Sequence, residues 1–182
     1  MARQFDRIVL AVPELSAASA QYQQLLGVSP LARDLPQGGL VAWWGLSNTV
    51  IELVQAAIDK PRLQGIVFSA PEAAALETPV ANSLGVDIRL GDGRRTADFR
   101  LAHPAAQCTG FTIDHVVLRT DDAQACIDLF AGELGIRLAL DKAAPAWGGR
   151  MLLFRAGKLT LEVIEAEGDA RSGNAFWGLA YQ

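Results

Sequence analysis

The feature that most constrains the fold of this chain is an internal repeat. The segment 5–10 (Phe-Asp-Arg-Ile-Val-Leu) returns 108 positions later at 113–118 as Ile-Asp-His-Val-Val-Leu, with His115 in place of Arg7. The Leu-Gly-Val of residues 26–28 also returns at that offset, as Leu-Gly-Ile. Because ordered markers at one spacing indicate duplicated structural units, the sequence predicts two homologous halves.

A shorter period is visible inside the first half. The segment 65–68 repeats the opening strand 58 positions later, and the Leu-Gly-Val of residues 84–86 repeats the end of the first helix at the same offset. We therefore expect residues 1–104 to form two modules, and residues 105–182 to form one full module and the first strand of a fourth. An unfinished module leaves a sheet edge unpaired, so the pattern predicts a homodimer, or a piece of a longer protein.

Each module is expected to contain a strand, a helix and three further strands. Residues 5–12 form an apolar strand, and Ala18 and Tyr22 lie on one face of the following helix, which Gly27 ends. The predicted fold class is α+β, with tandem βαβββ modules that form curled mixed β-sheets and carry helices on their outer face.

The second and third modules follow the same order. In the second, Pro71 and Glu72 are expected to open a helix, and strands are expected at 86–90 and 97–102. In the third, Asp121 and Asp122 form a helix N-cap pair. The strands expected in the third module are 112–120, 137–141, 150–155 and 159–165.

Composition excludes several classes of function. The net charge is −4 and no basic stripe exists, so nucleic acid is not an expected partner. No apolar run approaches the roughly 18 residues of a membrane span, and no signal peptide is recognised, so a membrane is not an expected partner either. Cys108 and Cys126 form no paired motif, which favours reduced thiols and a cytoplasmic location.

Two carboxylates stand out because they occupy apolar strand faces. Glu52 alternates with Val50 and Val54, and Glu162 alternates with Thr160 and Ile164. An unpaired buried charge is too costly, so each carboxylate needs water or a polar partner. For Glu162 the nearest candidate partner is the lone strand histidine, His115, although a histidine of this kind is more often part of a hydrogen-bonded core.

This arrangement resembles the vicinal oxygen chelate superfamily, also called the glyoxalase/bleomycin resistance/dioxygenase family. The resemblance rests on 114–118 (Asp-His-Val-Val-Leu), on the Leu-Gly of 134–135 and on 161–163 (Leu-Glu-Val). It implies modules curled around a cleft in which a divalent metal is chelated by two neighbouring substrate oxygens. His115 and Glu162 match the family's ligand positions, so Mn, Fe, Ni or Zn is the implied cofactor.

The sequence departs from the family pattern at two places. The position of a third ligand is Gly178, which has no donor side chain, so the residues leave open whether a metal is bound. Without one, His115 and Glu162 could move protons next to a carbonyl group. In the first half Arg7 replaces the histidine, and we expect Arg7 and Glu52 to form a vestigial ion pair.

The resemblance implies a glyoxalase-like or dioxygenase-like enzyme, such as a lyase, isomerase or dioxygenase, that acts on a small oxygen-rich molecule. Two alternatives stay open: a metal-free small-molecule binding protein of the bleomycin-resistance type, and a degenerate structural relative. Arg119 and Arg150 are candidates to hold an anionic substrate, and Trp147 and Trp177 are candidates to line the cleft. For each arginine, the alternative is a simple surface charge.

Overall fold

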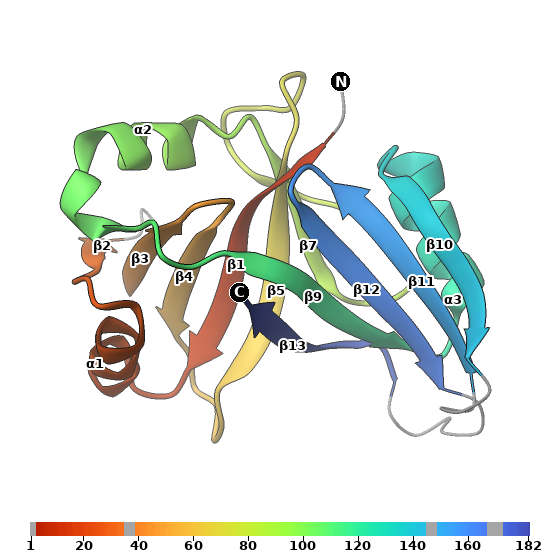
Figure 1. The fold of residues 1–182 in the computed structure, drawn as a ribbon, viewed down its shortest axis with the longest axis horizontal. Helices are drawn as coiled ribbons and strands as arrows, with labels where there is room; N and C mark the ends of the chain where they lie inside the picture. The colour runs from red at the N-terminus through yellow and green to blue at the C-terminus, as the bar shows by residue number, and fades with distance from the viewer. Residues whose placement is uncertain (1–2, 35–38, 145–148, 167–172) are drawn as a thin grey trace.

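The structure, a computed structural model, describes residues 3–34, 39–144, 149–166 and 173–182. Within these ranges the strands form two curled mixed sheets, one from each half of the chain, and a few helices pack against them (Figure 1). The strands of the first sheet are β1 (Gln4–Val12), β2 (Leu31–Asp34), β3 (Leu40–Leu46), β4 (Val50–Gln55), β5 (Arg62–Ser69), β6 (Thr78–Pro79), β7 (Asp87–Gly91) and β8 (Gln107–Cys108).

The second sheet has the strands β9 (Ile113–Thr120), β10 (Arg137–Ala144), β11 (Gly149–Ala156), β12 (Leu159–Ala166) and β13 (Ala175–Tyr181). The helical elements are α1 (Leu15–Leu26), α2 (Arg94–Ala102), η1 (Pro104–Ala106), α3 (Ala123–Cys126) and η2 (Ile127–Glu133). The predicted α+β class with curled mixed sheets is therefore confirmed.

The two sheets repeat the same topology. Four strands follow the order β2-β3-β4-β1 in the first sheet and β10-β11-β12-β9 in the second, and β5 and β13 pair next to the first strand of each set. The register also repeats, because Val9 faces Glu52 and Gly65 just as Val117 faces Glu162 and Gly178. Arg7 and His115 thus occupy equivalent places.

Apolar side chains from both halves form one core. The largest cluster of buried residues contains Ile8 and Ile51 of the first sheet together with Leu118, Leu161 and Phe154 of the second. These residues lie on the faces that pack against α1 in the first sheet and against α3 and η2 in the second, which follows from strand alternation, whereas Phe99 of α2 packs against Trp43 on the opposite face of the first sheet. The opposite faces carry Arg7 and Glu52 in the first sheet and His115 and Glu162 in the second.

The second module differs from the predicted pattern. Residues 71–77 form turns instead of a helix, and they lead into the short strand β6. Proline at positions 71 and 79 limits the backbone there, and the segment places Glu77 against Arg7. Residues 97–102, expected to be a strand, belong to α2.

Local contacts explain why α2 is a helix. Gly93 adopts a left-handed conformation at φ 75°, and the Asp92 side chain accepts a hydrogen bond from the Arg94 amide. Phe99 is 2% exposed, whereas Leu101 is 86% exposed, so the apparent alternation of apolar residues is not a buried strand face. The interpretation of this segment as a strand was wrong for that reason.

The helix of the third module begins as the cap pair predicts. Asp122 accepts a hydrogen bond from the Ala125 amide, and Glu165 of β12 accepts one from the Ala123 amide. After Cys126 the helix widens into the π-helix η2, and Gly135 follows it at φ 64°. Cys126 is fully buried, and burial raises its thiol pKa to about 11, so it is held as an inert thiol.

The first sheet extends slightly beyond the division expected at residue 104. The strand β8 lies after that point in the chain, but it pairs with β3 of the first sheet. No helix in the described part of the chain is long and apolar enough to cross a membrane.

Candidate functional site

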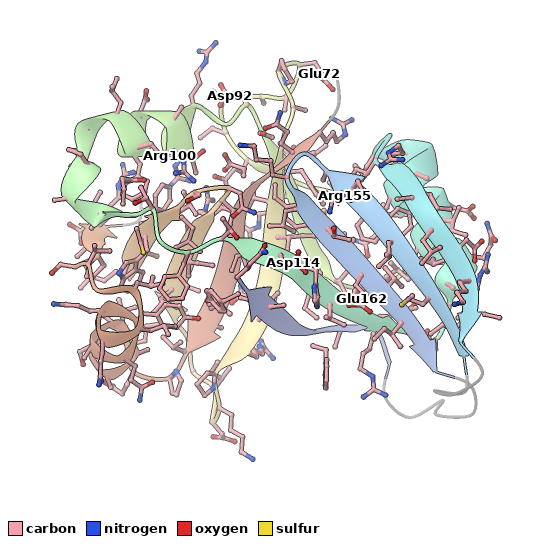
Figure 2. The ribbon with its side chains drawn as sticks, viewed as in Figure 1. Glu72, Asp92, Arg100, Asp114, Arg155 and Glu162 are labelled. Carbon is pink, nitrogen blue, oxygen red and sulfur yellow. The ribbon has the colours of Figure 1, made fainter. Side chains whose placement is uncertain are left out.

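The open face of the second sheet is the face that carries His115, Val117, Thr160, Glu162 and Leu153. His115 and Glu162 are partly exposed on it, whereas Val117 and Thr160 are buried; on the helix-covered face the central residues Val116, Leu118, Leu161 and Val163 are fully buried. Alternation on β9, β11 and β12 places these residues together, since their strands pair in register. The open face therefore presents polar groups to solvent above a rigid sheet (Figure 2).

His115 and Glu162 meet on this face. The Nε2 atom of His115 lies 3.3 Å from Oε2 of Glu162, and its Nδ1 atom lies 2.8 Å from Oδ2 of Asp114. The side chains of His115 and Glu162 are 31% and 17% exposed, so both are held by the sheet yet accessible. Asp114 and Glu162 offer only acceptor oxygens, so the imidazole lies between two groups that can receive a ring N–H.

Asp114 was not among the candidate site residues. Strand alternation would turn the side chains of neighbouring residues to opposite faces, so the sequence alone gave no reason to pair Asp114 with His115. Its carboxylate is 58% exposed at the start of β9 and bends back to the imidazole. Asp114 thereby fixes the orientation of the ring that Glu162 meets from the other side.

The third position on this face is Gly178 of β13. Nothing lies within 4 Å of the place where its Cβ would be, so the space beside Val117 is open. The equivalent Gly65 differs, because a Cβ there would lie 2.6 Å from the Asp87 carbonyl oxygen. Close packing of β5 on β7 explains the glycine at 65 but does not explain the one at 178.

The described residues do not by themselves form a metal centre. They contain no group of three or more His, Cys, Asp or Glu side chains that could hold a metal ion. His115 and Glu162 supply two donors, while catalytic zinc sites have three protein ligands. The donor set thus does not fit a resident metal without ligands from elsewhere.

A polar row continues from His115 across the sheet. In register, His115 faces Thr160, and Thr160 faces Arg155 of β11. Arg155 donates a hydrogen bond from Nη1 to the Thr160 hydroxyl at 2.5 Å. Thr160 and Arg155 were not predicted as site residues, but the register of β11 with β12 would have indicated them.

The other candidate residues lie in different places. Arg119 is on the same face of β9 as His115, opposite Ile164 of β12. Arg150 lies on the helix-covered face of β11, where it forms a two-point ion pair with Asp141 at 2.8 and 2.7 Å. The structure thus brings Arg119 to the open face and does not bring Arg150 there.

Two tryptophans were expected near the cleft. Trp177 is 67% exposed on β13, where the pairing with β9 shifts by one residue between Phe176 and Gly178. Trp147 lies outside the described residues. Only Trp177 can therefore be placed, and it lies beside the open face at the edge strand of the sheet.

In the first half the equivalent face carries a buried charge cluster. Nε of Arg7 lies 2.6 Å from Oε2 of Glu52, and Nη2 of Arg7 lies 2.6 Å from Oε1 of Glu77. The expected contact between Arg7 and Glu52 is therefore present. It is an ion pair without hydrogen-bond geometry, because neither Nε of Arg7 nor Oε2 of Glu52 has a hydrogen-bond partner among the described residues. Glu77 was not predicted, because it comes from the segment expected to be helical.

The remaining members of this cluster surround the same guanidinium. Asp6 lies 3.3 Å from Arg7, and the Arg7 guanidinium stacks 4.7 Å from the ring centroid of the buried Trp43. Burial alone would lower the pKa of Arg7, but Glu52 and Glu77 outweigh it and raise the pKa. Arg95 also contacts Glu77, at 3.1 Å, and we call Asp6, Arg7, Trp43, Glu52, Glu77 and Arg95 the Arg7 cluster.

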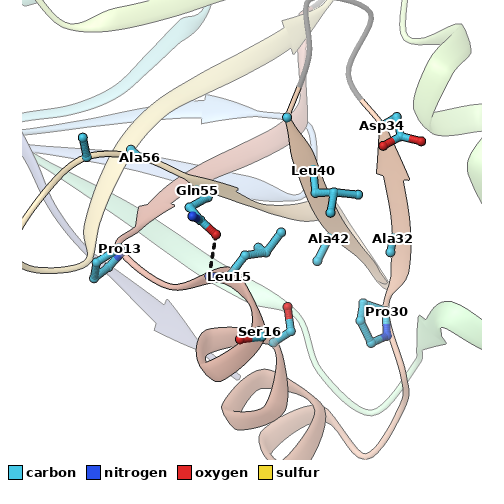
Figure 3. A pocket seen from close by; sticks show the side chains of 13 residues that line it. Pro13, Leu15, Ser16, Pro30, Ala32, Asp34, Leu40, Ala42, Gln55 and Ala56 are labelled. Carbon is cyan, nitrogen blue, oxygen red and sulfur yellow. Dashed lines mark hydrogen bonds between the residues drawn. The ribbon is translucent and has the colours of Figure 1, made fainter.

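Three cavities in the described part of the chain lie away from His115 and Glu162. One, of about 990 Å³, opens between the start of α1 and strands β2 and β3, and is lined mainly by small apolar side chains (Figure 3). A second cavity of about 470 Å³ lies where the two halves meet. A third of about 150 Å³ borders the Arg7 cluster.

Several solved structures with the same fold are named as enzymes. A mutant of 4-hydroxymandelate synthase from Streptomyces coelicolor superimposes with a TM-score of 0.65 and 15% identity, over 99% of this chain and 71% of that one. A Mn(II)-bound glyoxalase from Novosphingobium aromaticivorans gives a TM-score of 0.61 and 15% identity, over 100% and 66%. 2,2',3-Trihydroxybiphenyl 1,2-dioxygenase from Sphingomonas wittichii gives 0.55 and 13%, over 90% and 68%.

The chain has the vicinal oxygen chelate fold. The predicted resemblance to that superfamily is therefore confirmed at the level of the fold, which these neighbours share. The sequence matches no family model and no curated protein. At identities this low the neighbours establish the fold alone, so the activity has to be argued from the open face of the second sheet itself.

Proposed function

We propose that this protein is a glyoxalase-like or dioxygenase-like enzyme that acts on a small oxygen-rich molecule at the open face of its second sheet. The observation that carries the proposal is the contact of His115 Nε2 with Glu162 Oε2 at 3.3 Å on that face. A molecule bound on the open face would meet an acid and a base that lie side by side. The neighbours of the same fold act on small molecules, which supports this class of substrate.

The geometry supports proton transfer next to a carbonyl group. Glu162 takes a proton from the substrate carbon, and His115 gives its Nε2 proton to the carbonyl oxygen, so that an enol forms with no net change in charge on the substrate. Asp114 holds the His115 ring through Nδ1, which keeps Nε2 directed at the substrate. Return of the two protons at the alternative positions completes an isomerisation.

A divalent metal would change the role of the same two side chains. His115 and Glu162 would then be ligands, as the resemblance implies, and further donors would have to come from the substrate, water or another chain. The glyoxalase neighbour is a Mn(II)-bound protein, which is why metal content has to be measured directly. No step of the proposed proton transfer depends on such an ion.

We further propose that the protein acts as a cytoplasmic homodimer. In the described residues β13 is the last strand of its sheet, so one side of its backbone is unpaired, and Trp177 lies exposed on it. A free edge next to an exposed aromatic favours pairing with a second copy. Such a contact would cover the side of the open face next to Gly178.

A metal-free small-molecule binding protein is the second candidate. Gly178 favours this alternative, because the open face lacks a third donor where the space for one exists. A binder would use the open face without proton transfer. The two functions therefore differ in a single chemical measurement.

The deciding experiment is exchange of substrate protons with solvent. Hydroxyacetone, a small molecule with neighbouring oxygens, is incubated with the protein in D₂O, and deuterium incorporation at carbon is followed by NMR. We expect exchange by the wild type, and a loss of about 10²-fold or more in His115→Ala and Glu162→Gln. Glu133→Gln, an exposed change of the same chemistry at the end of η2, should exchange at the wild-type rate.

Elemental analysis of the same samples determines whether the protein binds a metal and which one. A Gly178→His variant is the positive control, since a side chain fits there and would supply the third donor. Exchange that is absent from the wild type, with or without added Mn, Fe, Ni or Zn, would reject the enzyme proposal and leave the binding protein. Exchange that is unchanged in both site variants would show that other groups do the chemistry.

A further inference from the structure

The cavity at the junction of the two halves is a polar site that the proposed function does not use. It has a volume of about 470 Å³ and lies between β1, the turn after β3, the start of α2 and the turn between β11 and β12. We call it the junction cavity. The residues of its lining that matter for binding are Asp6, Asn48, Ser69, Thr96, Arg100 and Lys158.

Arg100 differs from the other arginines of its segment. Arg89, Arg94 and Arg95 each have a carboxylate within 3.2 Å. Arg100 instead donates to two neutral oxygens, the Thr49 carbonyl at 2.6 Å and the Gln107 side chain at 3.3 Å, and it has no ion pair within the described ranges. A guanidinium has five N–H donors, so this one keeps donors for a ligand.

The acid that shares this cavity is already engaged. One carboxylate oxygen of Asp6 contacts Arg7 at 3.3 Å, and the other accepts a hydrogen bond from the Thr96 hydroxyl. Burial lowers the pKa of Arg100, and Asp6 offsets only part of that effect. The positive charge of Arg100 is therefore poorly compensated by the protein around it.

A second cation comes from the other half of the chain. Lys158 lies in the turn between β11 and β12, and it too has no ion pair among the residues that the structure describes. Asn48 brings the turn close, because its amide donates to the Ile113 carbonyl at 2.7 Å and to the Lys158 carbonyl at 3.5 Å. The hydroxyl of Ser69 lines the same space as a further donor.

We propose that the junction cavity binds a small oxyanion, carried by a phosphate or carboxylate group, between Arg100 of the first half and Lys158 of the second. A planar guanidinium matches the spacing of two oxygens on such a group, and the lysine adds a point charge. The cavity volume suits a ligand of metabolite size that bears this group. Binding there would tie the two halves together.

The test measures oxyanion binding by isothermal titration calorimetry. Inorganic phosphate and acetate are titrated separately, with chloride at equal ionic strength as the blank, and the two arms distinguish a phosphate from a carboxylate ligand. Arg100→Gln and Lys158→Gln should each weaken binding by about tenfold or more, since each removes a charge-assisted contact. Arg94→Gln removes the same charge from α2 outside the cavity, where its side chain is 81% exposed, and should bind as the wild type does.

If Arg100→Gln does not fold, Lys158→Gln still tests the proposal. The side chain of Lys158 is exposed, and the substitution keeps the backbone carbonyl that accepts a hydrogen bond from Asn48. Binding of either anion that is weakened at Arg100 or Lys158 but not at Arg94 supports the site, and the preferred anion names the group. Absence of binding by both anions overturns the proposal. Binding that falls equally in Arg94→Gln also overturns it, because net charge would then explain the effect.

Discussion

At the scale of single residues, one substitution separates the two halves. Arg7 and His115 occupy the same register position, yet one is 2% exposed within a cage of carboxylates and the other is 31% exposed on an open face. The first half therefore holds a permanently charged guanidinium among buried carboxylates, while the second half has an accessible imidazole at the equivalent position. We expect the first to contribute to stability and the second to carry the proposed chemistry.

This difference predicts that Arg7→Met is strongly destabilising. Glu52 and Glu77 would remain largely buried, with side chains 10% and 12% exposed, and would lose the cation between them. Breaking a buried pair on one side costs about 3–5 kcal/mol of unfolding free energy. Urea denaturation followed by circular dichroism measures the loss.

Arg3→Met is the matched control for that change. Arg3 pairs at 2.9 Å with Glu72, whose side chain is 59% exposed, so water solvates the carboxylate that remains. We expect a much smaller loss of stability than in Arg7→Met. Equal losses in the two variants would contradict the structural role of the Arg7 cluster.

Asp6 gives the cluster a defined dependence on pH. Burial raises the pKa of Asp6 above its usual value of 3.8, against the opposing effects of Thr96 and Arg7. The folded state therefore holds this proton more tightly than the unfolded state does. The protonated Asp6 carboxyl therefore contributes to the unfolding free energy below its unfolded-state pKa. This contribution is lost as the pH rises through its folded-state pKa.

We accordingly expect Asp6→Asn to become more stable relative to the wild type as the pH rises from about 4 towards neutrality. The measurement is the difference in unfolding free energy between the two proteins at several pH values, which cancels the groups that they share. A constant difference across that range would show that Asp6 titrates alike in both states. The Asn side chain keeps an oxygen to accept from Thr96, so the comparison isolates the charge.

At the scale of elements, the sequence predicted those parts whose signals are local. The third module shows this best, because alternation, the Asp121–Asp122 pair and Gly135 each act within a few residues. The predictions for 71–77 and 97–102 were wrong for different reasons: a distant contact positions the first segment, whereas the second begins a helix through local contacts at Asp92 and Gly93 that its apparent alternation concealed. Glu77 reaches Arg7, which is 70 residues away in the chain, and no local pattern encodes that contact.

The same limit explains the candidate site. The repeat placed His115 and Glu162 on one face, and the structure brings them to 3.3 Å. Arg155 and Thr160 required the strand register, which depends on pairing between β11 and β12. Arg150 was predicted to hold an anionic substrate because the sequence alone does not show which face of its strand packs against the helix.

The helix of the third module offers a prediction at this scale. Of the two acidic residues before α3, only Asp122 accepts a cap hydrogen bond from its side chain, from the Ala125 amide at 2.8 Å. Asp122→Ala should lower the unfolding free energy by about 1 kcal/mol. Asp121→Ala removes the same charge next to the same helix and should cost clearly less, as measured by thermal denaturation; a reversed order would contradict the cap.

At the scale of the whole molecule, the halves are joined by a shared core and a few specific contacts. The Tyr22 and Tyr181 hydroxyls lie 3.2 Å apart, one on α1 and the other on β13. Asn48 binds the backbone of Ile113 with both ends of its amide, at 2.7 and 3.1 Å. Ile113 is the first residue of β9. Asn48, in the turn between β3 and β4, therefore holds the start of the strand that carries His115.

Asn48 should therefore control how tightly the two halves unfold together. In Asn48→Ala the amide and carbonyl of Ile113 lose their partner, at a cost of about 1–3 kcal/mol. Asn82→Ala is the matched control, since Asn82 also binds backbone groups through both ends, at Val80 and Val86, but entirely within the first half. Both variants should be less stable than the wild type in urea.

Only the Asn48 variant should separate the transitions of the halves. With Trp147 and Trp177 replaced by Phe, fluorescence of Trp43 and Trp44, which are fully buried in β3, reports on the first sheet, whereas hydrogen exchange of the β9 and β12 amides reports on the second. In the wild type and in Asn82→Ala the two signals should give one midpoint. In Asn48→Ala the amides of β9 and β12 should exchange at urea concentrations where the tryptophans are still buried. Coincident midpoints in that variant would show that the shared apolar core alone couples the halves, and that the His115 strand does not depend on Asn48 for its position.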